Sequence, residues 1–153
     1  MRFEEKQNMI SPWILIIMAV VFGSIIYPHI NDLESIWKDP GFYILFVVFG
    51  LLFLMNLTTR YDEEGIYINF IPLVWKKRIS WKEIQYARLE TYGLFDYGGW
   101  GYRMGKSGTA ITAKGKYGMK IALMSGKFLL IGTQHPEEIQ RIINHYLPIE
   151  NES

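Results

Sequence analysis

The sequence contains no cysteine among its 153 residues, and it has no internal repeat or low-complexity tract. The absence of cysteine excludes disulfide bonds, thiolate metal sites and cysteine nucleophiles, and it leaves the redox compartment open. Half of the residues are hydrophobic, at the upper end of the range for soluble domains. The length allows one domain of ordinary size with appendages.

An excess of charge of one sign is also missing. The formal net charge is +1, and residues 1–57 carry three Lys/Arg against five Asp/Glu, whereas residues 58–153 carry thirteen against ten. The second part is mildly basic, far from the strong bias of a dedicated nucleic-acid-binding protein. We therefore expect no nucleic-acid partner.

Patterns that carry catalysis or bind metals are scarce. The three histidines, His29, His135 and His145, show no metal-ligand spacing with a third donor. No Ser/His/Asp arrangement surrounds a nucleophile turn. We therefore predict no catalytic residue, no metal site and no cofactor, and we expect that the protein is not an enzyme.

Residues 98–108, GGWGYRMGKSG, resemble a phosphate-binding loop because they are rich in glycine and end in Gly-Lys-Ser. The P-loop pattern, however, requires glycine where Trp100 stands, and the dinucleotide fingerprint fails by its spacing. Residues 108–114, GTAITAK, predict a strand instead of the helix whose N-terminus would hold a phosphate. We therefore expect no nucleotide ligand.

Two uncharged apolar runs cover residues 10–27 and 41–57. Each would measure roughly 26 Å as a helix, near the lower limit for a membrane span. Trp13, Tyr27 and Tyr43 stand at their ends, as interface aromatics do. We predict a transmembrane helical hairpin over residues 10–57, with the lipid bilayer as its partner. Two core helices of a soluble protein, or a cleaved signal peptide, are the alternatives; residues 1–9 are balanced in charge and no cleavage site follows, which disfavours the second.

Basic residues follow the second run, whereas the segment between the runs has one lysine and three acids. Lys and Arg in short flanks remain on the cytoplasmic side. We therefore predict a multi-pass protein of the cell membrane with both termini cytoplasmic and residues 1–9 as a short cytoplasmic segment.

Residues 58–148 predict a mainly β domain. Alternating apolar positions such as Ile66, Ile68 and Phe70, with turn residues between the runs, indicate about seven short strands, as in a sandwich or barrel. Ser80 and Glu83 form a capping-box pattern that predicts one helical turn. Residues 135–147 predict a helix with a single apolar face, begun by a proline, and residues 149–153 form a tail. A small barrel closed by a C-terminal helix is the layout of the pleckstrin-homology (PH) superfold.

Three short motifs resemble a known family: small bacterial membrane proteins with a PH-like domain. The motifs are Ile79-Ser80-Trp81-Lys82-Glu83-Ile84, Gly99-Trp100-Gly101-Tyr102-Arg103, and Ile131-Gly132-Thr133 leading to Pro136-Glu137-Glu138. The resemblance implies a two-helix membrane hairpin followed by a cytoplasmic PH-like barrel, and it supplies no catalytic residue. Lipid-binding members of the wider superfold have a basic first hairpin turn, whereas residues 62–65 here read DEEG, which would repel a phosphate.

The glycine-rich segment is the best candidate site, because long connections often carry function. We interpret it as a loop in which Trp100 anchors the chain to the barrel, and we predict Trp100, Tyr102 and Arg103 as the contacts to a ligand or partner. Arg103 either binds an anionic ligand or peptide carboxylate, or hydrogen-bonds carbonyl groups of the loop.

A second candidate is the basic group formed by Lys76, Lys77, Arg78 and Lys82. These residues either set the topology and rest against anionic lipid or form an ordinary solvated strand end. Together the patterns predict a non-enzymatic binding or scaffolding module that engages a protein, a peptide or a neighbouring membrane subunit. The alternative is a membrane-associated sensor of a lipid headgroup or small anion.

Overall fold

The computed structural model describes residues 1–93, 101–105 and 108–147. The chain forms two compact units, one of Met1–Met9 with Asn56–Ser153 and one of Ile10–Met55. The first nine residues are therefore part of the β unit, whereas the sequence suggested a separate segment. The helical unit is inserted between two strands of that β unit.

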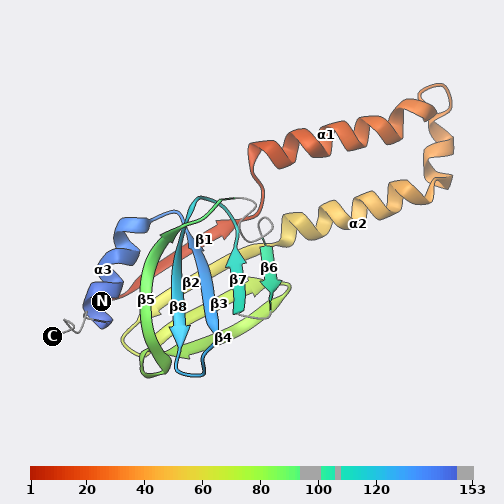
Figure 1. Cartoon of the computed structure of the whole chain (residues 1–153). Helices are drawn as coiled ribbons and strands as arrows, with labels where there is room; N and C mark the ends of the chain where they lie inside the picture. Colours follow the sequence, from red (N-terminus) through yellow and green to blue (C-terminus); the bar gives the residue numbers. More distant parts are fainter. Residues whose placement is uncertain (94–100, 106–107, 148–153) are drawn as a thin grey trace. The chain divides into compact units, whose positions relative to one another are not determined.

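The first sheet is an antiparallel meander in the order β1 (Phe3–Asn8), β2 (Asn56–Asp62), β3 (Gly65–Ile71) and β4 (Val74–Ser80) (Figure 1). The expected alternation in β3 is confirmed, because Ile66, Ile68 and Phe70 are completely buried. Strand β1 was not predicted. Its inward positions hold Glu5 and Gln7, so it lacks the apolar alternation that marks a half-buried strand.

The second sheet has the order β5-β8-β9-β7-β6. Its strands are β5 (Ile84–Thr91), β6 (Gly101–Met104), β7 (Gly108–Thr112), β8 (Tyr117–Leu123) and β9 (Phe128–Thr133). The pairing of β7 with β9 is parallel and the others are antiparallel. Strand β6 lies within the segment that we interpreted as a loop.

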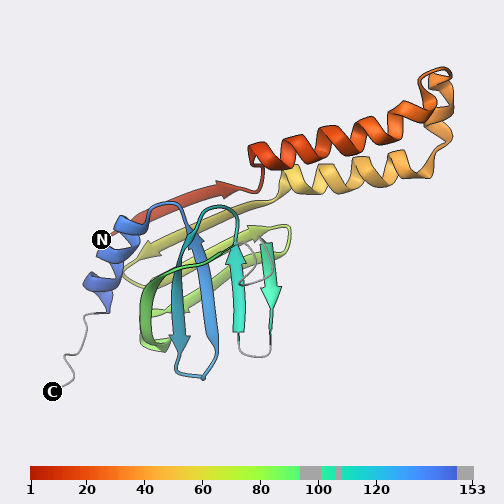
Figure 2. The same ribbon diagram turned by 45° about the horizontal axis from the view of Figure 1, so that its top comes forward.

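The expected closed barrel is wrong. The described residues form nine strands in two separate sheets, with no strand pairing between the sheets. Figures 1 and 2 show the two sheets as stacked layers. The core between them is apolar, and its fully buried side chains include Leu57, Tyr61 and Phe70 from the first sheet and Met119 and Ile131 from the second.

Buried polar side chains of β1 join the two layers. Glu5 is only 4% exposed, and its carboxylate accepts hydrogen bonds from the Thr133 hydroxyl and the Gln134 backbone N–H, both at 2.7 Å. Gln7 donates its side-chain N–H to the carbonyl of Gly132 at 2.9 Å. A buried carboxylate is tolerated when its oxygens are hydrogen-bonded. These bonds explain why a polar strand occupies an inward position, and they fix β1 to the end of β9.

The predicted C-terminal helix and the predicted single helical turn are confirmed. Helix α3 (Pro136–Tyr146) begins at the proline and buries Ile139, Ile142 and Ile143. The turn η3 (Trp81–Glu83) follows β4, where the Ser80 N–H donates to Glu83 at 3.4 Å. The Trp81 ring stacks on Tyr146 with centroids 4.5 Å apart, so the turn holds the last residue of α3.

The helical unit consists of α1 (Pro12–Ile26), η1 (Tyr27–His29), η2 (Leu33–Lys38) and α2 (Pro40–Leu54). The two long helices pack through Met18, Leu45 and Phe49. Within the described residues one helix, Pro12–His29, is long and apolar enough to cross a membrane, and α2 with 15 residues is shorter than a span requires. Two spans were expected, and only the first is supported. The second run ends early because Asn56 already pairs in β2.

Candidate binding sites on the two sheet faces

Each sheet has a cleft on its surface. The first-sheet groove has a volume of about 450 Å³ and is lined by Glu4, Thr58, Arg60, Tyr67, Ile68, Asn69, Lys76 and Arg78. The second-sheet pocket has a volume of about 690 Å³ and is lined by Tyr86, Arg103, Met104, Gly105, Gly108, Thr109, Ala110, Lys120, Phe128 and Leu130. Both clefts contain arginine, but the arginines differ in their partners.

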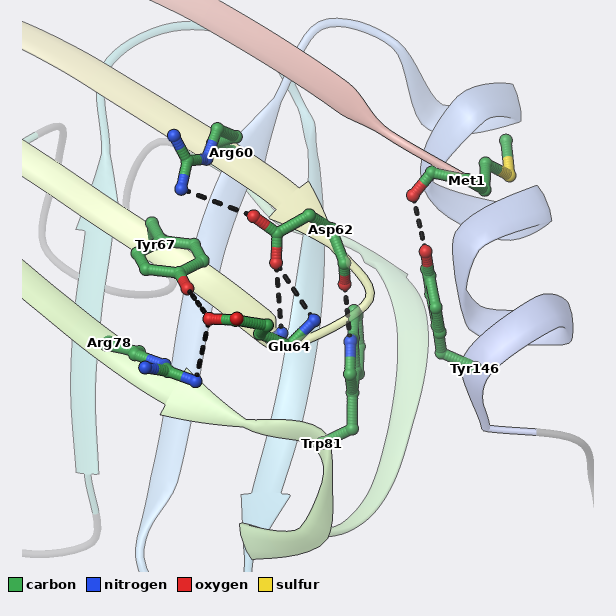
Figure 3. Close-up of polar contacts among 9 residues, drawn as sticks. Met1, Arg60, Asp62, Glu64, Tyr67, Arg78, Trp81 and Tyr146 are labelled. Atoms are coloured by element: carbon green, nitrogen blue, oxygen red, sulfur yellow. Dashed lines mark hydrogen bonds and ion pairs between the residues drawn. The ribbon is translucent and has the colours of Figure 1, made fainter.

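The arginines of the first-sheet groove are ion-paired with acids of the β2–β3 turn (Figure 3). Arg60 lies 3.2 Å from the Asp62 carboxylate, and Arg78 lies 3.0 Å from the Glu64 carboxylate. The Tyr67 ring lies between them, with the guanidinium carbons of Arg60 and Arg78 at 4.3 and 5.4 Å from its centroid. Cations at these distances are attracted to the ring face.

The Tyr67 hydroxyl completes this network by donating to Glu64 at 2.7 Å. The hydrogen bond to the carboxylate raises the pKa of Tyr67 above its ordinary value, with smaller contributions from burial and nearby acids. The neutral hydroxyl therefore keeps Glu64 directed at Arg78. The acidic turn, which we expected to repel phosphate, also neutralises the arginines beside it.

The turn itself is held by Asp62. Its carboxylate accepts from the backbone N–H groups of Glu64 at 3.0 Å and Gly65 at 3.3 Å, and its carbonyl accepts from the Trp81 indole at 2.7 Å. A Cβ at Gly65 would lie 2.1 Å from the carbonyl oxygen of Ile79, so only glycine fits there. The position of Glu64 is therefore built into the hairpin.

The four residues of the predicted basic group do not lie on one surface. Lys76 and Arg78 line the first-sheet groove, Lys77 is half-buried opposite Ile68, and Lys82 lies in η3. Strand β4 is an edge strand with an irregular register, and Lys76 has a φ of 49°. Lysines and bulges at an edge hinder pairing with another chain. Contact of this group with anionic lipid stays a prediction.

The surface of the second-sheet pocket follows from strand register. Arg103 is paired with Ala110, Ala110 with Leu130, and Leu130 with Lys120. These four side chains therefore lie in one row on one face, with a cation at each end and apolar groups between. A neighbouring row on the same face holds Phe128, Ala122 and Tyr86. The pocket thus has an apolar floor between two positive charges.

The two cations differ in their pairing. Lys120 lies 3.1 Å from the Glu90 carboxylate, which also pairs with Arg88 at 3.3 Å. The side chain of Arg103 is exposed, and its guanidinium makes no hydrogen bond or ion pair to any described residue. It is therefore an available donor of charge-assisted hydrogen bonds at the side of the pocket.

Tyr92 packs on the same face as the pocket. A Cβ at Gly118 would lie 3.0 Å from the Tyr92 ring, and one at Gly132 would lie 2.9 Å from its hydroxyl oxygen. The two glycines therefore make room for the ring, which is buried with Ala110 and Leu130. Burial raises the pKa of Tyr92 to about 12.

The structure separates the residues that the sequence grouped together. Trp100 lies outside the described residues. Tyr102 is paired with the fully buried Ile111, so it lies on the opposite face of β6 from Arg103. Of Tyr102 and Arg103, the two that the structure describes, only Arg103 lines the pocket. Phe128 and Lys120 were missed, because their approach to Arg103 depends on the parallel pairing of β7 with β9.

No group of three or more His, Asp or Glu side chains in residues 1–93, 101–105 and 108–147 could hold a metal ion. The strand predicted after Gly108 is confirmed as β7, so no helix begins there. Comparison of the sequence with family models and with curated proteins finds no match. The case for function therefore depends on the geometry of the two clefts.

Proposed function

We propose that this chain is an integral membrane protein whose β unit is a non-enzymatic, PH-like binding or scaffolding module in the cytoplasm. The observation that carries the proposal is the second-sheet pocket, where an arginine without a partner among the described residues borders an apolar floor. Pockets of this size that combine apolar walls with a few polar groups are typical of binding sites.

Exposed apolar side chains support the membrane anchor. Ile17 and Val20 in α1 are 60% and 66% exposed, and Phe46 in α2 is 68% exposed. Surfaces of this kind are covered by lipid or by a partner. Among the described residues, the helix Pro12–His29 is the one that is long and apolar enough to cross a membrane. We therefore assign the anchor to this helix.

The arrangement of the β unit supports a PH-like module. Two stacked sheets followed by one C-terminal helix fit the layout that the sequence motifs suggested, although the sheets do not close into a barrel. Fold alone does not define a ligand. The binding role therefore depends on the pocket, and its natural partner is a protein, a peptide or a neighbouring membrane subunit.

Two exposed methionines offer a matched test. Met104 lines the second-sheet pocket and is 76% exposed, whereas Met124, in the β8–β9 turn, is 67% exposed and does not line it. A photo-crosslinking residue at each position, in the full chain in native membranes, reports what lies beside it. We expect Met104 to capture a defined partner and Met124 to capture much less. Equal capture at the two positions would contradict the proposal.

A second candidate function is a sensor of a lipid headgroup or a small anion. The specific observation in its favour is the exposed Arg103 guanidinium, which no described acid neutralises. The arginines of the first-sheet groove do not offer this, because Asp62 and Glu64 already hold them. An Arg103→Ala variant tests this role, since a sensor should lose its ligand and remain folded.

A further inference from the structure

We propose that the second-sheet pocket binds a single-chain amphiphile with an anionic head, such as a fatty carboxylate or an alkyl phosphate. The inference rests on the second candidate function and names the ligand class. Arg103 would bind the head, and the alkyl chain would lie along the apolar floor. Three features of the pocket lead to this ligand: its charge, its floor and its size.

The positive charge of the pocket favours an anionic ligand. Arg103 and Lys120 are its only charged lining residues within the described chain, and both are positive. Lys120 shares Glu90 with Arg88, so its charge is partly neutralised, whereas no described acid is paired with Arg103. A single carboxylate or phosphate on the guanidinium would form charge-assisted hydrogen bonds of the kind arginine forms in a planar fork.

The apolar floor of the pocket favours a ligand with an alkyl chain. Ala110 and Leu130 lie between the two cations, and Phe128 and Tyr86 lie in the next row. The Phe128 and Tyr86 side chains are 38% and 43% exposed, so they offer surface that an alkyl chain would remove from water. A compact inorganic anion would leave this surface bare.

The size of the pocket favours a small molecule over a membrane surface. A volume of about 690 Å³ lies within the range of small-molecule sites. A polyphosphorylated headgroup would require several unpaired cations at close quarters, and the described lining supplies one. The first-sheet groove is smaller, at about 450 Å³, and its arginines are ion-paired. The second-sheet pocket is therefore the better place for an anionic amphiphile.

Equilibrium dialysis with the full chain in phosphatidylcholine nanodiscs tests the proposal, with empty nanodiscs subtracted. The probes are octanoate, decanoate, decyl phosphate, decanol and inorganic phosphate. Decanoate and decyl phosphate separate a carboxylate head from a phosphate head. We expect at least one of them to bind, with affinity rising about fourfold for each added methylene, and decanol and inorganic phosphate to bind far more weakly.

Variants locate the binding. Replacing Arg103 with glutamine should weaken binding of the anionic probe by about ten- to hundredfold, because a charge-assisted contact is lost. The matched control is Arg88→Gln, which removes an arginine on β5 that is paired across the strands with Lys120 and does not line the pocket, and it should change binding less than twofold. Met104→Ser should reduce the effect of chain length and leave the preference for an anionic head.

Equal binding of decanoate and decanol, or undiminished binding by Arg103→Gln, would overturn the proposal. So would the absence of binding by both anionic probes. Failure of this inference is distinguishable from failure of the proposed function. If neither amphiphile binds while the crosslinker at Met104 still captures a protein, the binding module stands and the ligand class is wrong.

Discussion

The first-sheet groove and the second-sheet pocket contain the same kind of cation in different electrostatic settings. In the groove, Arg60 and Arg78 are held by carboxylates from the adjacent turn and by the Tyr67 ring. In the pocket, Arg103 has no such partner in the described chain. A basic residue is therefore available for a ligand only if its own neighbours leave it unneutralised, and that depends on strand register.

The largest effect should come from breaking the bonds that hold the two layers together. Glu5→Ala leaves the Thr133 hydroxyl and the Gln134 N–H without their buried acceptor. We expect the free energy of unfolding to fall by roughly 2–4 kcal/mol. Urea denaturation followed by circular dichroism measures it.

The neighbouring Glu4 is the matched control. It is exposed and pairs with Lys6 at 3.5 Å on the surface. We expect Glu4→Ala to change stability by less than about 0.5 kcal/mol, because exposed pairs contribute little. Similar losses for the two variants would show that the layers are not joined by Glu5.

The next effect is a pH dependence that differs between the two faces. Burial raises the pKa of Tyr92 from 10.0 to about 12, so its stabilisation is complete below pH 10 and is lost as the pH rises towards 12. A shift of this size corresponds to about 3 kcal/mol. Tyr92→Phe should therefore make the decline in stability between pH 10 and pH 12 less steep, and the buried Tyr61, whose pKa burial also raises, should maintain the rest of it.

Tyr67 should behave differently because its raised pKa has another cause. The hydrogen bond to Glu64, and not burial, is the main reason. Glu64→Gln should lower the pKa of Tyr67 towards its ordinary value and leave that of Tyr92 unchanged. Titration of tyrosinate absorbance, compared with that of the Tyr67→Phe and Tyr92→Phe variants, measures each pKa. Equal pKa shifts in the two tyrosines would contradict the claim that their pKa values are raised by different causes.

A smaller effect should distinguish a structural arginine from an available one. Arg60→Gln removes an ion pair and a contact with the Tyr67 ring, so we expect a loss of about 1 kcal/mol in stability. Arg103→Gln should cost less than about 0.5 kcal/mol, because it removes no described partner. Thermal unfolding of both variants checks the order, and a larger loss for Arg103→Gln would make Arg103 structural.

The smallest expected effect is a gain in phosphate affinity at the first-sheet groove. Asp62 and Glu64 are ion-paired with the arginines of the first-sheet groove. Glu64→Gln should therefore leave Arg78 available to bind an anion. We expect inorganic phosphate to bind this variant a few-fold more tightly than the original chain, and less so at high salt. Unchanged phosphate binding at low salt would show that ion pairing does not limit the groove.

Local patterns in the sequence were sufficient to predict many of the strands and the C-terminal helix. The buried alternation of Ile66, Ile68 and Phe70 and the apolar face of α3 were predicted correctly, because each depends on spacing within one element. Strand β1 was missed because its inward positions are polar, and Glu5 is stabilised by Thr133 and Gln134, which are more than a hundred residues away in the sequence.

The candidate site was predicted only in part. Arg103 was identified from the glycine-rich segment, but the surface around it could not be, since Leu130 and Phe128 reach it through the parallel pairing of β7 with β9. Tyr102 was predicted as a contact together with Arg103, but strand alternation puts its side chain on the other face of β6. Pairing between distant strands leaves no local signal in a single sequence.

The most direct test that the second-sheet pocket is the binding site combines the crosslinker at Met104 with Arg103→Gln in the full chain in native membranes. Met104 and Arg103 line the same pocket, and Met104 reports occupancy without removing the arginine. We predict that Arg103→Gln greatly reduces the captured product while the protein remains folded and at its normal level in the membrane. The same product in the same yield, with and without the arginine, would contradict the claim that this pocket is the binding site.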